Sequence, residues 1–141
     1  MILVDAGPLF AIIHRNDTAH ERCVTTLNTL RGPLVTTWPA FTEAMYLLGA
    51  AVGWRGQEPL WRLVSRRTLE LAEATPNMVD RMPVLMARYS DLPMDLADAS
   101  LVALADERRI TRIFTLDHHF RIYRLDSGQH FSVIPGHLLR D

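Results

Sequence analysis

Short runs of apolar residues recur along the chain, and each is bounded by residues that favour turns. Residues 2–4 (ILV) form the first run, which is followed by Asp5 and the Gly7-Pro8 pair, so we expect a buried strand closed by a breaker. The same pattern predicts four further short strands, at 34–37, 68–72, 112–116 and 131–134.

Helical periodicity fills most of the chain between these runs. Asp17 or Thr18 is expected to cap the second helix, and Pro39 suits the first position of the third. The expected helices cover about 9–14, 18–30, 39–51, 57–66, 77–89, 95–108 and 119–123. Strands that alternate with helices require crossover connections. We therefore predict an α/β fold: one domain over 1–141, with a central, largely parallel twisted sheet of about four or five strands and helices on both faces.

The composition narrows the class of protein. The chain has 141 residues, of which 48% are hydrophobic and 22% charged, and its net charge is −1, so an intrinsically disordered chain is excluded. Cys23 is the only cysteine, which excludes an intrachain disulfide and a multi-cysteine zinc site. The apolar N-terminus lacks a basic leader, and Glu43 interrupts the longest apolar stretch, so we expect no signal peptide, no membrane span and a cytoplasmic location.

Four carboxylates stand apart from the other polar residues of the chain. Asp5 and Asp117 each follow a predicted strand, and the carboxyl ends of parallel strands meet at one edge of a sheet. Glu43 and Asp98 fall in the first or second turn of a predicted helix, where the helix dipole tolerates negative charge. The spacing also places Asp98 on the apolar face of its helix. We therefore expect the four side chains to converge.

Such convergence favours a bound cation. Two ionised carboxylates about 4 Å apart repel by roughly 4 kcal/mol at an effective dielectric near 20. Four partly desolvated carboxylates must therefore take up protons or bind a cation. Oxygen ligands suit Mg²⁺ or Mn²⁺, which can activate water and neutralise charge on a phosphodiester. The sequence thus predicts a metal site, and Asp98 faces the interior because it binds the metal ion.

Each aspartate also has a local structural interpretation that the sequence leaves open. Asp95 is a candidate helix N-cap with Asp98 as its partner in a capping box. Asp5 can begin a turn before Gly7, and Asp117 can cap the short helix that follows it. Glu43 has no comparable local role, and its helical neighbours are mostly apolar.

Several segments, taken together and in order, resemble one known family. They are VDAGPL (4–9), NDTAHERC (16–23), TTWPAFTEAMYLL (36–48), LPMDLADASLVALADE (92–107), IFTLDHHF (113–120) and FSVIP (131–135). Each motif is short, but the ordered set covers nearly the whole chain. On this basis the chain resembles the PIN-domain ribonucleases, particularly the VapC-like toxins of bacteria and archaea.

The resemblance implies an Mg²⁺- or Mn²⁺-dependent endoribonuclease that hydrolyses RNA without a covalent enzyme intermediate. It also implies a cognate antitoxin and a homodimer as partners, and a role as the toxin of a toxin–antitoxin pair. The implied metal-binding and catalytic residues are Asp5, Glu43, Asp98 and Asp117, with Asp95 as an accessory ligand and Thr115 as a supporting hydroxyl.

The chain departs from the family pattern at two places. Gly7 stands where many members carry a small polar residue, and His118-His119 stands where many carry a further acid. Candidate RNA-binding residues are Arg15, Arg121 and Arg124, for which ordinary solvated arginines are the alternative.

Other classes of protein remain as alternatives. A non-catalytic PIN-like module would bind RNA or protein through the same fold, although four intact acids argue against it. A receiver-like phosphoacceptor domain needs an acidic pair after its first strand and a later lysine. This chain has one aspartate at that place and no lysine anywhere, so it ranks far behind.

Overall fold

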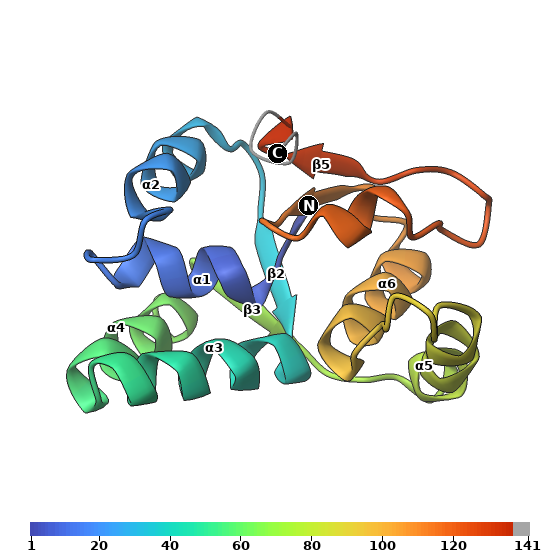
Figure 1. Cartoon of the computed structure of the whole chain (residues 1–141), viewed down its shortest axis with the longest axis horizontal. Helices are drawn as coiled ribbons and strands as arrows, with labels where there is room; N and C mark the ends of the chain where they lie inside the picture. The colour runs from blue at the N-terminus through green and yellow to red at the C-terminus, as the bar shows by residue number, and fades with distance from the viewer. Residues whose placement is uncertain (137–141) are drawn as a thin grey trace.

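A computed structural model describes residues 1–136 and contains one five-stranded sheet (Figure 1). Every strand pairing in it is parallel, and the strand order is β3-β2-β1-β4-β5. The strands are β1 (Ile2–Val4), β2 (Leu34–Thr37), β3 (Leu69–Ala72), β4 (Arg112–Phe114) and β5 (Ser132–Ile134). The predicted parallel sheet is confirmed. The last strand of the described residues, β5, lies at one edge of the sheet.

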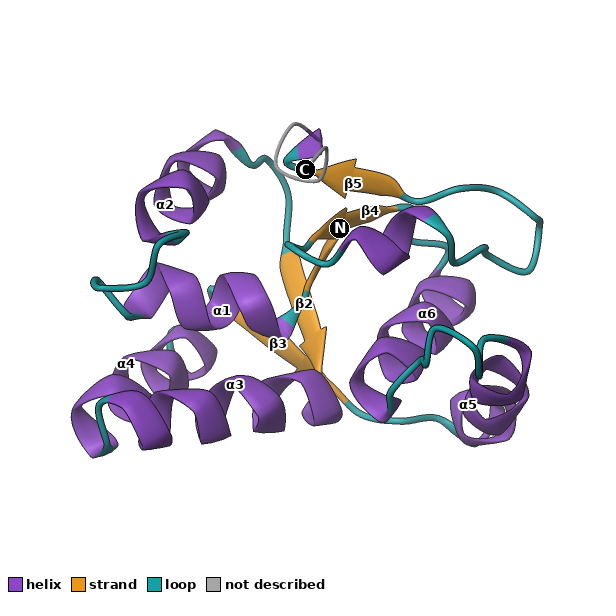
Figure 2. Cartoon of the chain, in the orientation of Figure 1, coloured by secondary structure: helices purple, strands orange, loops and turns teal. Residues whose placement is uncertain are grey.

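Helices cover both faces of the sheet, as Figure 2 shows. They are α1 (Ala6–Ile13), α2 (His20–Thr29), α3 (Trp38–Ala51), α4 (Trp54–Ser65), α5 (Pro76–Arg88), α6 (Leu96–Arg108) and the short 3₁₀ helix η1 (His118–Arg121). Alternate residues of β1 point to opposite faces, as the pleat requires. Ile2 and Val4 pack with α1–α4, whereas Leu3 packs with α5, α6 and η1.

The chain order creates one switch point in the sheet. From β1 the chain moves to β2 and β3 on one side, and it returns to β4 and β5 on the other. The crossovers therefore leave β1 and β4 in opposite directions. In open α/β sheets, binding sites form beyond the carboxyl ends of the two strands at such a point. Asp5 follows β1 and Asp117 lies three residues beyond β4, so both residues lie at this switch point.

Two details of the N-terminal segment differ from the prediction. Gly7-Pro8 was expected to break the chain, but both residues lie in the first turn of α1, which begins directly after Asp5. Proline is tolerated there because the first N–H groups of a helix have no intrahelical acceptor. The N-cap of α2 is Ala19, and Asp17 accepts the Ala19 N–H at 3.0 Å in the turn before the helix.

Helix α6 is buried around its whole circumference from Ala97 to Ala105. It packs against α5, α3 and β2. The expectation of an amphipathic helix with one inward face is therefore wrong. Asp98 itself is buried, as its place on the apolar face predicted, whereas Asp95 and Leu96 at the same end of α6 are exposed. Within residues 1–136, no helix combines the length and the apolar character that a membrane crossing needs.

Candidate functional site

The five acidic side chains singled out in the sequence line one cavity beyond the ends of β1 and β4. Its volume is about 300 Å³. The lining residues are Asp5, Ala6, Gly7, Glu43, Leu47, Asp95, Asp98, Leu116 and Asp117. They come from the start of α1, the second turn of α3, the start of α6 and the segment after β4. We call this cavity the carboxylate pocket.

Asp5 is more buried than Asp117, the other carboxylate at the strand ends, and only 7% of the residue is exposed. Its Oδ1 accepts the Ala6 N–H at 2.7 Å and its Oδ2 accepts the Thr115 hydroxyl at 2.7 Å. Burial raises the pKa of Asp5 to about 6, against these two hydrogen bonds, and the charges of Asp117 and Glu43 raise it further. The carboxylate is thus fixed in position by neutral donors that leave its negative charge uncompensated.

Thr115 joins the two strand ends that form the floor of the pocket. Its side chain is fully buried. The hydroxyl donates to Asp5 Oδ2 and accepts the Asp117 N–H at 2.9 Å. Asp117 in turn accepts the His119 N–H at 2.9 Å and is the N-cap of η1. The local capping role considered for Asp117 is therefore present, and it coexists with a place in the pocket wall.

Asp95 and Asp98 form the α6 side of the pocket. Asp95 is the N-cap of α6 and accepts the Asp98 N–H at 2.8 Å, so its local capping role is also present. The residue Asp98 is 7% exposed, and its Oδ2 accepts the Tyr123 hydroxyl at 2.8 Å. Burial raises the pKa of Asp98 well above its usual range despite the Tyr123 hydrogen bond, and Asp95, Asp5 and Asp117 add to the rise.

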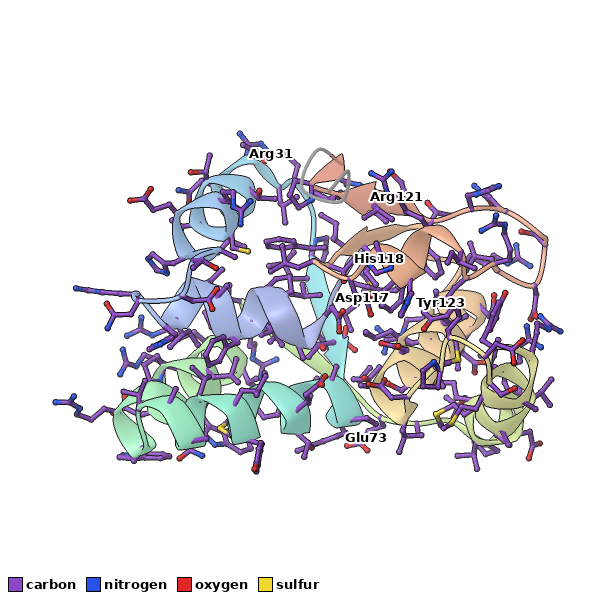
Figure 3. The ribbon with its side chains drawn as sticks, in the orientation of Figure 1. Arg31, Glu73, Asp117, His118, Arg121 and Tyr123 are labelled. Carbon is purple, nitrogen blue, oxygen red and sulfur yellow. The ribbon has the colours of Figure 1, made fainter. Side chains whose placement is uncertain are left out.

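Tyr123 is a site residue that sequence reasoning missed. It is fully buried and packs edge-on against Tyr89 and Phe120, with ring centroids 5.0 Å apart in both pairs. Figure 3 shows it beside Asp117. Burial is the main reason that its pKa is raised, and the Asp98 carboxylate adds to it. No local pattern marks this tyrosine; the one available signal is that a buried tyrosine hydroxyl needs a partner.

Glu43 reaches the pocket from α3 and is more exposed than its apolar neighbours suggested. Partial burial raises its pKa, and the charges of Asp95 and Asp117 raise it further. The start of α3 is fixed against α6, because the Thr37 hydroxyl caps α3 and lies 2.6 Å from the Ser100 hydroxyl. This buried contact holds the Glu43 helix and the Asp98 helix at a constant separation.

The donor set fits a hydrated divalent cation. Within residues 1–136, all five charged side chains that line the pocket are carboxylates, and no arginine or histidine lines it. The carboxylate oxygens are spread around the cavity. Among the described residues, the three potential metal ligands whose ligand atoms all lie within 4.8 Å of one another are Asp117, His118 and His119, and the other carboxylates of the pocket do not form so close a group. Mg²⁺ keeps several waters and needs few direct carboxylates, so a spread of this kind suits it.

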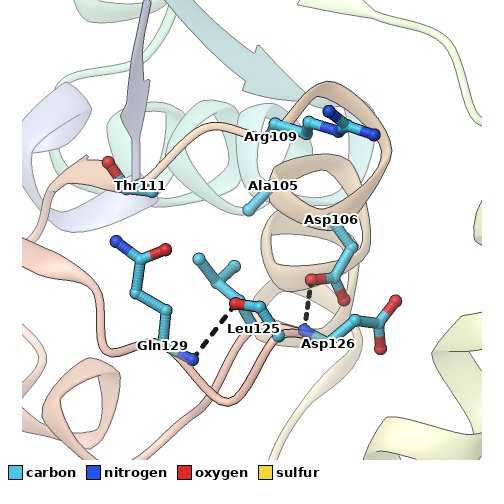
Figure 4. A pocket seen from close by; sticks show the side chains of 8 residues that line it. Ala105, Asp106, Arg109, Thr111, Leu125, Asp126 and Gln129 are labelled. Carbon is cyan, nitrogen blue, oxygen red and sulfur yellow. Dashed lines mark hydrogen bonds between the residues drawn. The ribbon is translucent and has the colours of Figure 1, made fainter.

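A larger cavity of about 420 Å³ lies at the other end of α6 and has different electrostatics (Figure 4). Asp106 and Asp126 line it, and Arg81 pairs with both of them. The Asp126 N–H also donates to Asp106 at 2.8 Å. Here the arginine balances the acidic charge internally. Among the described residues no such cation lines the carboxylate pocket, and this contrast makes it the candidate functional site.

The structure brings none of the three candidate RNA-binding arginines into the pocket lining. Arg15 lies beyond the far end of α1, about 12 Å of helix from Asp5, and lines a separate cavity with Arg55 and His20. Arg124 donates to the carbonyl groups of Arg121, Ile122 and Tyr123, so it holds the loop after η1. Arg121 is exposed and donates to the Gly136 carbonyl.

Known proteins resemble this chain in sequence. A family model for the PIN domain matches residues 2–125. A curated relative, Ribonuclease VapC26 of Mycobacterium tuberculosis, is 27% identical over 135 residues, which are 95% of this chain and 100% of the relative.

Three solved structures share the fold. The Mycobacterium tuberculosis toxin VapC20, described as cleaving the sarcin–ricin loop, has a TM-score of 0.75 at 15% identity, over 80% of this chain and 87% of that one. A toxin–antitoxin complex from Klebsiella pneumoniae has a TM-score of 0.64 at 16% identity, over 83% and 87%. VapBC2 of Rickettsia felis, bound to a fragment of promoter DNA, has a TM-score of 0.64 at 13% identity, over 94% and 97%.

Proposed function

Because this chain belongs to the PIN domain family, we propose that it is a divalent-metal-dependent endoribonuclease and the toxin of a toxin–antitoxin pair. The observation that carries the proposal is the carboxylate pocket: five acids from four separate segments line one cavity, and no basic residue of the described part of the chain lines it. The sequence relative named a ribonuclease supports the same activity. We also propose that the chain acts in the cytoplasm.

Asp5, Glu43, Asp98 and Asp117 would hold the ion, directly or through water, with Asp95 as an accessory ligand. When bound, Mg²⁺ or Mn²⁺ supplies activation of water and neutralisation of charge on the phosphodiester. The chain's own groups fix the ligands. Thr115 orients Asp5 and Tyr123 orients Asp98, each through one hydrogen bond to Oδ2. Within residues 1–136, Asp98 Oδ1 has no hydrogen-bond donor, whereas Asp5 Oδ1 also accepts the Ala6 N–H.

The energetic logic follows from the raised pKa values of Asp5 and Asp98. Burial makes their ionised forms costly without a counter-charge. A divalent cation removes this cost because it compensates the carboxylate charges, so the pocket is built to bind an ion and is destabilised without one.

Exposed apolar side chains on α3 and α4 offer a surface for the proposed protein partners. Tyr46 is 73% exposed and Trp54 is 61% exposed. Trp38, Leu47 and Trp61 are also exposed there. Patches of this kind mark interaction sites. We propose that an antitoxin segment and a second copy of the chain bind here, which light scattering of the purified chain, alone and co-expressed with its antitoxin, can test.

The decisive experiment is cleavage of end-labelled structured RNAs in Mg²⁺, Mn²⁺ or EDTA. We expect discrete cuts that need metal and disappear in Asp98→Asn, since the amide keeps the shape of the side chain and removes its charge. Asp80→Asn, an exposed change on α5, is the matched control and should cut like the wild type. Metal-dependent cleavage by folded Asp98→Asn would contradict the proposal. A wild type that neither cuts RNA nor binds Mn²⁺ would favour the non-catalytic binding module.

A further inference from the structure

We propose that Asp117, His118 and His119 form an accessory site for a divalent transition-metal ion at the rim of the carboxylate pocket. The site shares Asp117 with that pocket, but its two nitrogen ligands lie outside the pocket lining. Binding at this site does not depend on whether the chain cleaves RNA. The two histidines stand where many members of the family have an acid, so the nitrogen ligands of the proposed site are specific to this chain.

The three side chains already lie close to a coordinating arrangement. One ligand atom from each falls within 4.8 Å of the others, and His119 Nδ1 is 3.4 Å from Asp117 Oδ1. The rings of His118 and His119 are 4.4 Å apart between centroids, tilted by 55°. Two ligand atoms on opposite sides of an ion are about 4.2 Å apart when each metal–ligand bond is about 2.1 Å. This distance is only slightly shorter than the 4.8 Å within which the three ligand atoms lie. A small rotation of the rings therefore suffices to bind an ion.

The backbone that carries these ligands is held in place. Asp117 accepts the His119 N–H, and its own N–H donates to Thr115. Phe120, the next residue of η1, is fully buried and packs edge-on against Tyr123. The ligands therefore project from a fixed turn, and less conformational entropy is lost when an ion binds than at a flexible loop.

The histidine rings are available to an ion. His118 is exposed, and His119 is partly exposed. Apart from the approach of His119 to Asp117, neither ring makes a hydrogen bond within residues 1–136. Over the same residues, Asp117 uses only Oδ1 as a hydrogen-bond acceptor, which leaves Oδ2 without a protein donor. Figure 3 shows Asp117 and His118 adjacent to each other, near Tyr123.

The donor set determines which ions this site prefers. Imidazole nitrogen binds Co²⁺, Ni²⁺ and Zn²⁺ well, whereas Mg²⁺ prefers oxygen ligands. Affinity at a mixed nitrogen and oxygen site rises from Mn²⁺ through Co²⁺ to Ni²⁺. We therefore expect the accessory site to take Co²⁺, Ni²⁺ or Zn²⁺ and to be nearly indifferent to Mg²⁺. The carboxylate pocket, with oxygen ligands alone, takes Mg²⁺ or Mn²⁺.

The test is a Co²⁺ titration of the tag-free, EDTA-treated chain at pH 7.5, followed by calorimetry and visible absorption. The His118→Asn/His119→Asn variant keeps two polar side chains on η1 and should lose at least about tenfold in Co²⁺ affinity, with a changed ligand-field spectrum. Its Mg²⁺ affinity should stay within about twofold of the wild type, since Mg²⁺ does not need the imidazoles. His130→Asn, at an exposed histidine outside the trio, is the matched control and should behave like the wild type.

Two further measurements separate this proposal from the proposed nuclease function. Asp98→Asn alters the carboxylate pocket alone and should retain the histidine-dependent Co²⁺ spectrum, even where it abolishes RNA cleavage. A chain that fails to cut RNA but binds Co²⁺ through its histidines would support the accessory site and contradict the nuclease. Wild-type Co²⁺ affinity and spectrum in the folded double-histidine variant would overturn the accessory site, whatever the outcome for RNA.

Discussion

The hydroxyl of Tyr123 donates a hydrogen bond to Asp98 Oδ2 at 2.8 Å, and both residues are almost completely buried. Tyr123 lies after η1 and Asp98 lies in the first turn of α6. The bond therefore fixes the carboxylate of one element from another. It also lowers the pKa of Asp98 against the larger effect of burial.

Tyr123→Phe tests this relationship with little change in packing. The ring contacts with Tyr89 and Phe120 remain, whereas the hydrogen bond to the carboxylate is lost. We expect Mn²⁺ affinity to fall by about 1 kcal/mol, or roughly fivefold in Kd, because the ligand is no longer oriented. Calorimetric titration measures the change. Tyr89→Phe loses the hydroxyl that accepts the Arg124 N–H and serves as a control, with metal affinity expected to be unchanged.

Thr115→Val should damage the pocket through two partners at once. The substitution leaves Asp5 Oδ2 without its hydroxyl donor and the Asp117 N–H without its acceptor. Each unsatisfied buried group costs about 1–3 kcal/mol, so we expect a loss of at least about 2 kcal/mol in unfolding free energy together with weaker metal binding. Urea denaturation and Mn²⁺ titration measure the two effects.

Thr36→Val is the matched control for Thr115→Val. The Thr36 hydroxyl is buried and donates to the Val4 carbonyl at 2.7 Å, so its hydrogen bond is to the backbone and not to a carboxylate of the pocket. It should lower stability and leave metal affinity alone. Equal loss of metal affinity in both variants would show that Thr115 acts only through general stability.

The apo chain should become less stable as pH rises through the weakly acidic and neutral range. Asp5 has a folded pKa of about 6 against an ordinary value of 3.8, and the pKa of Asp98 is raised in the same direction. The folded state therefore binds more protons than the unfolded state above pH 3.8, and the stabilisation present at low pH is lost as pH passes each folded pKa.

Thermal melts with and without Mn²⁺ test this linkage. Because the ion binds the ionised carboxylates, the increase in Tm that it causes should be larger at pH 8 than at pH 5. Asp98→Asn should raise the apo Tm at pH 8 by about 3 °C, equivalent to roughly 1 kcal/mol, since it removes an uncompensated buried charge. An apo Tm that rises steadily from pH 5 to pH 8 would contradict the assigned shifts.

Gly7→Ser should be tolerated and should add a hydroxyl to the pocket. A Cβ at Gly7 would lie 3.7 Å from the nearest Leu116 atoms, an ordinary van der Waals distance. Serine has a better helix propensity than glycine, so we expect a gain of about 0.5 kcal/mol in stability. Gly53→Ser provides the contrast, because Gly53 has φ of +80° and a side chain there should cost about 1 kcal/mol. Denaturation of both variants checks the difference in sign.

Much of the fold was predictable because strands and helices depend on local patterns. The run Ile2–Val4 and the other short apolar segments were expected as strands of a parallel sheet, and the structure has five such strands. The local capping roles of Asp95 and Asp117 were also visible, since a cap bonds to a backbone group two or three residues away. The topology that those local patterns imply also predicted that Asp5, Glu43, Asp98 and Asp117 converge, and all four line one pocket; Asp95 was expected there only from the family resemblance.

The structure corrected the expectations that depended on distant neighbours. The Gly7-Pro8 pair does not break the chain, because α1 can begin directly on the Asp5 cap. Arg15 points to a separate cavity, since the whole length of α1 separates it from Asp5. Glu43 is exposed on α3 although its helical neighbours are apolar.

The sequence by itself determined which acids could carry chemistry: the isolated carboxylates at strand ends and helix starts. Only the tertiary structure decided how they are partnered. The Thr115–Asp5 and Tyr123–Asp98 hydrogen bonds join residues 110 and 25 positions apart. Arg81 balances the acids of one cavity, whereas no basic residue among those that the structure describes lines the carboxylate pocket. Charge compensation and burial are sums over all neighbours in space, and periodicity along the chain carries no record of them.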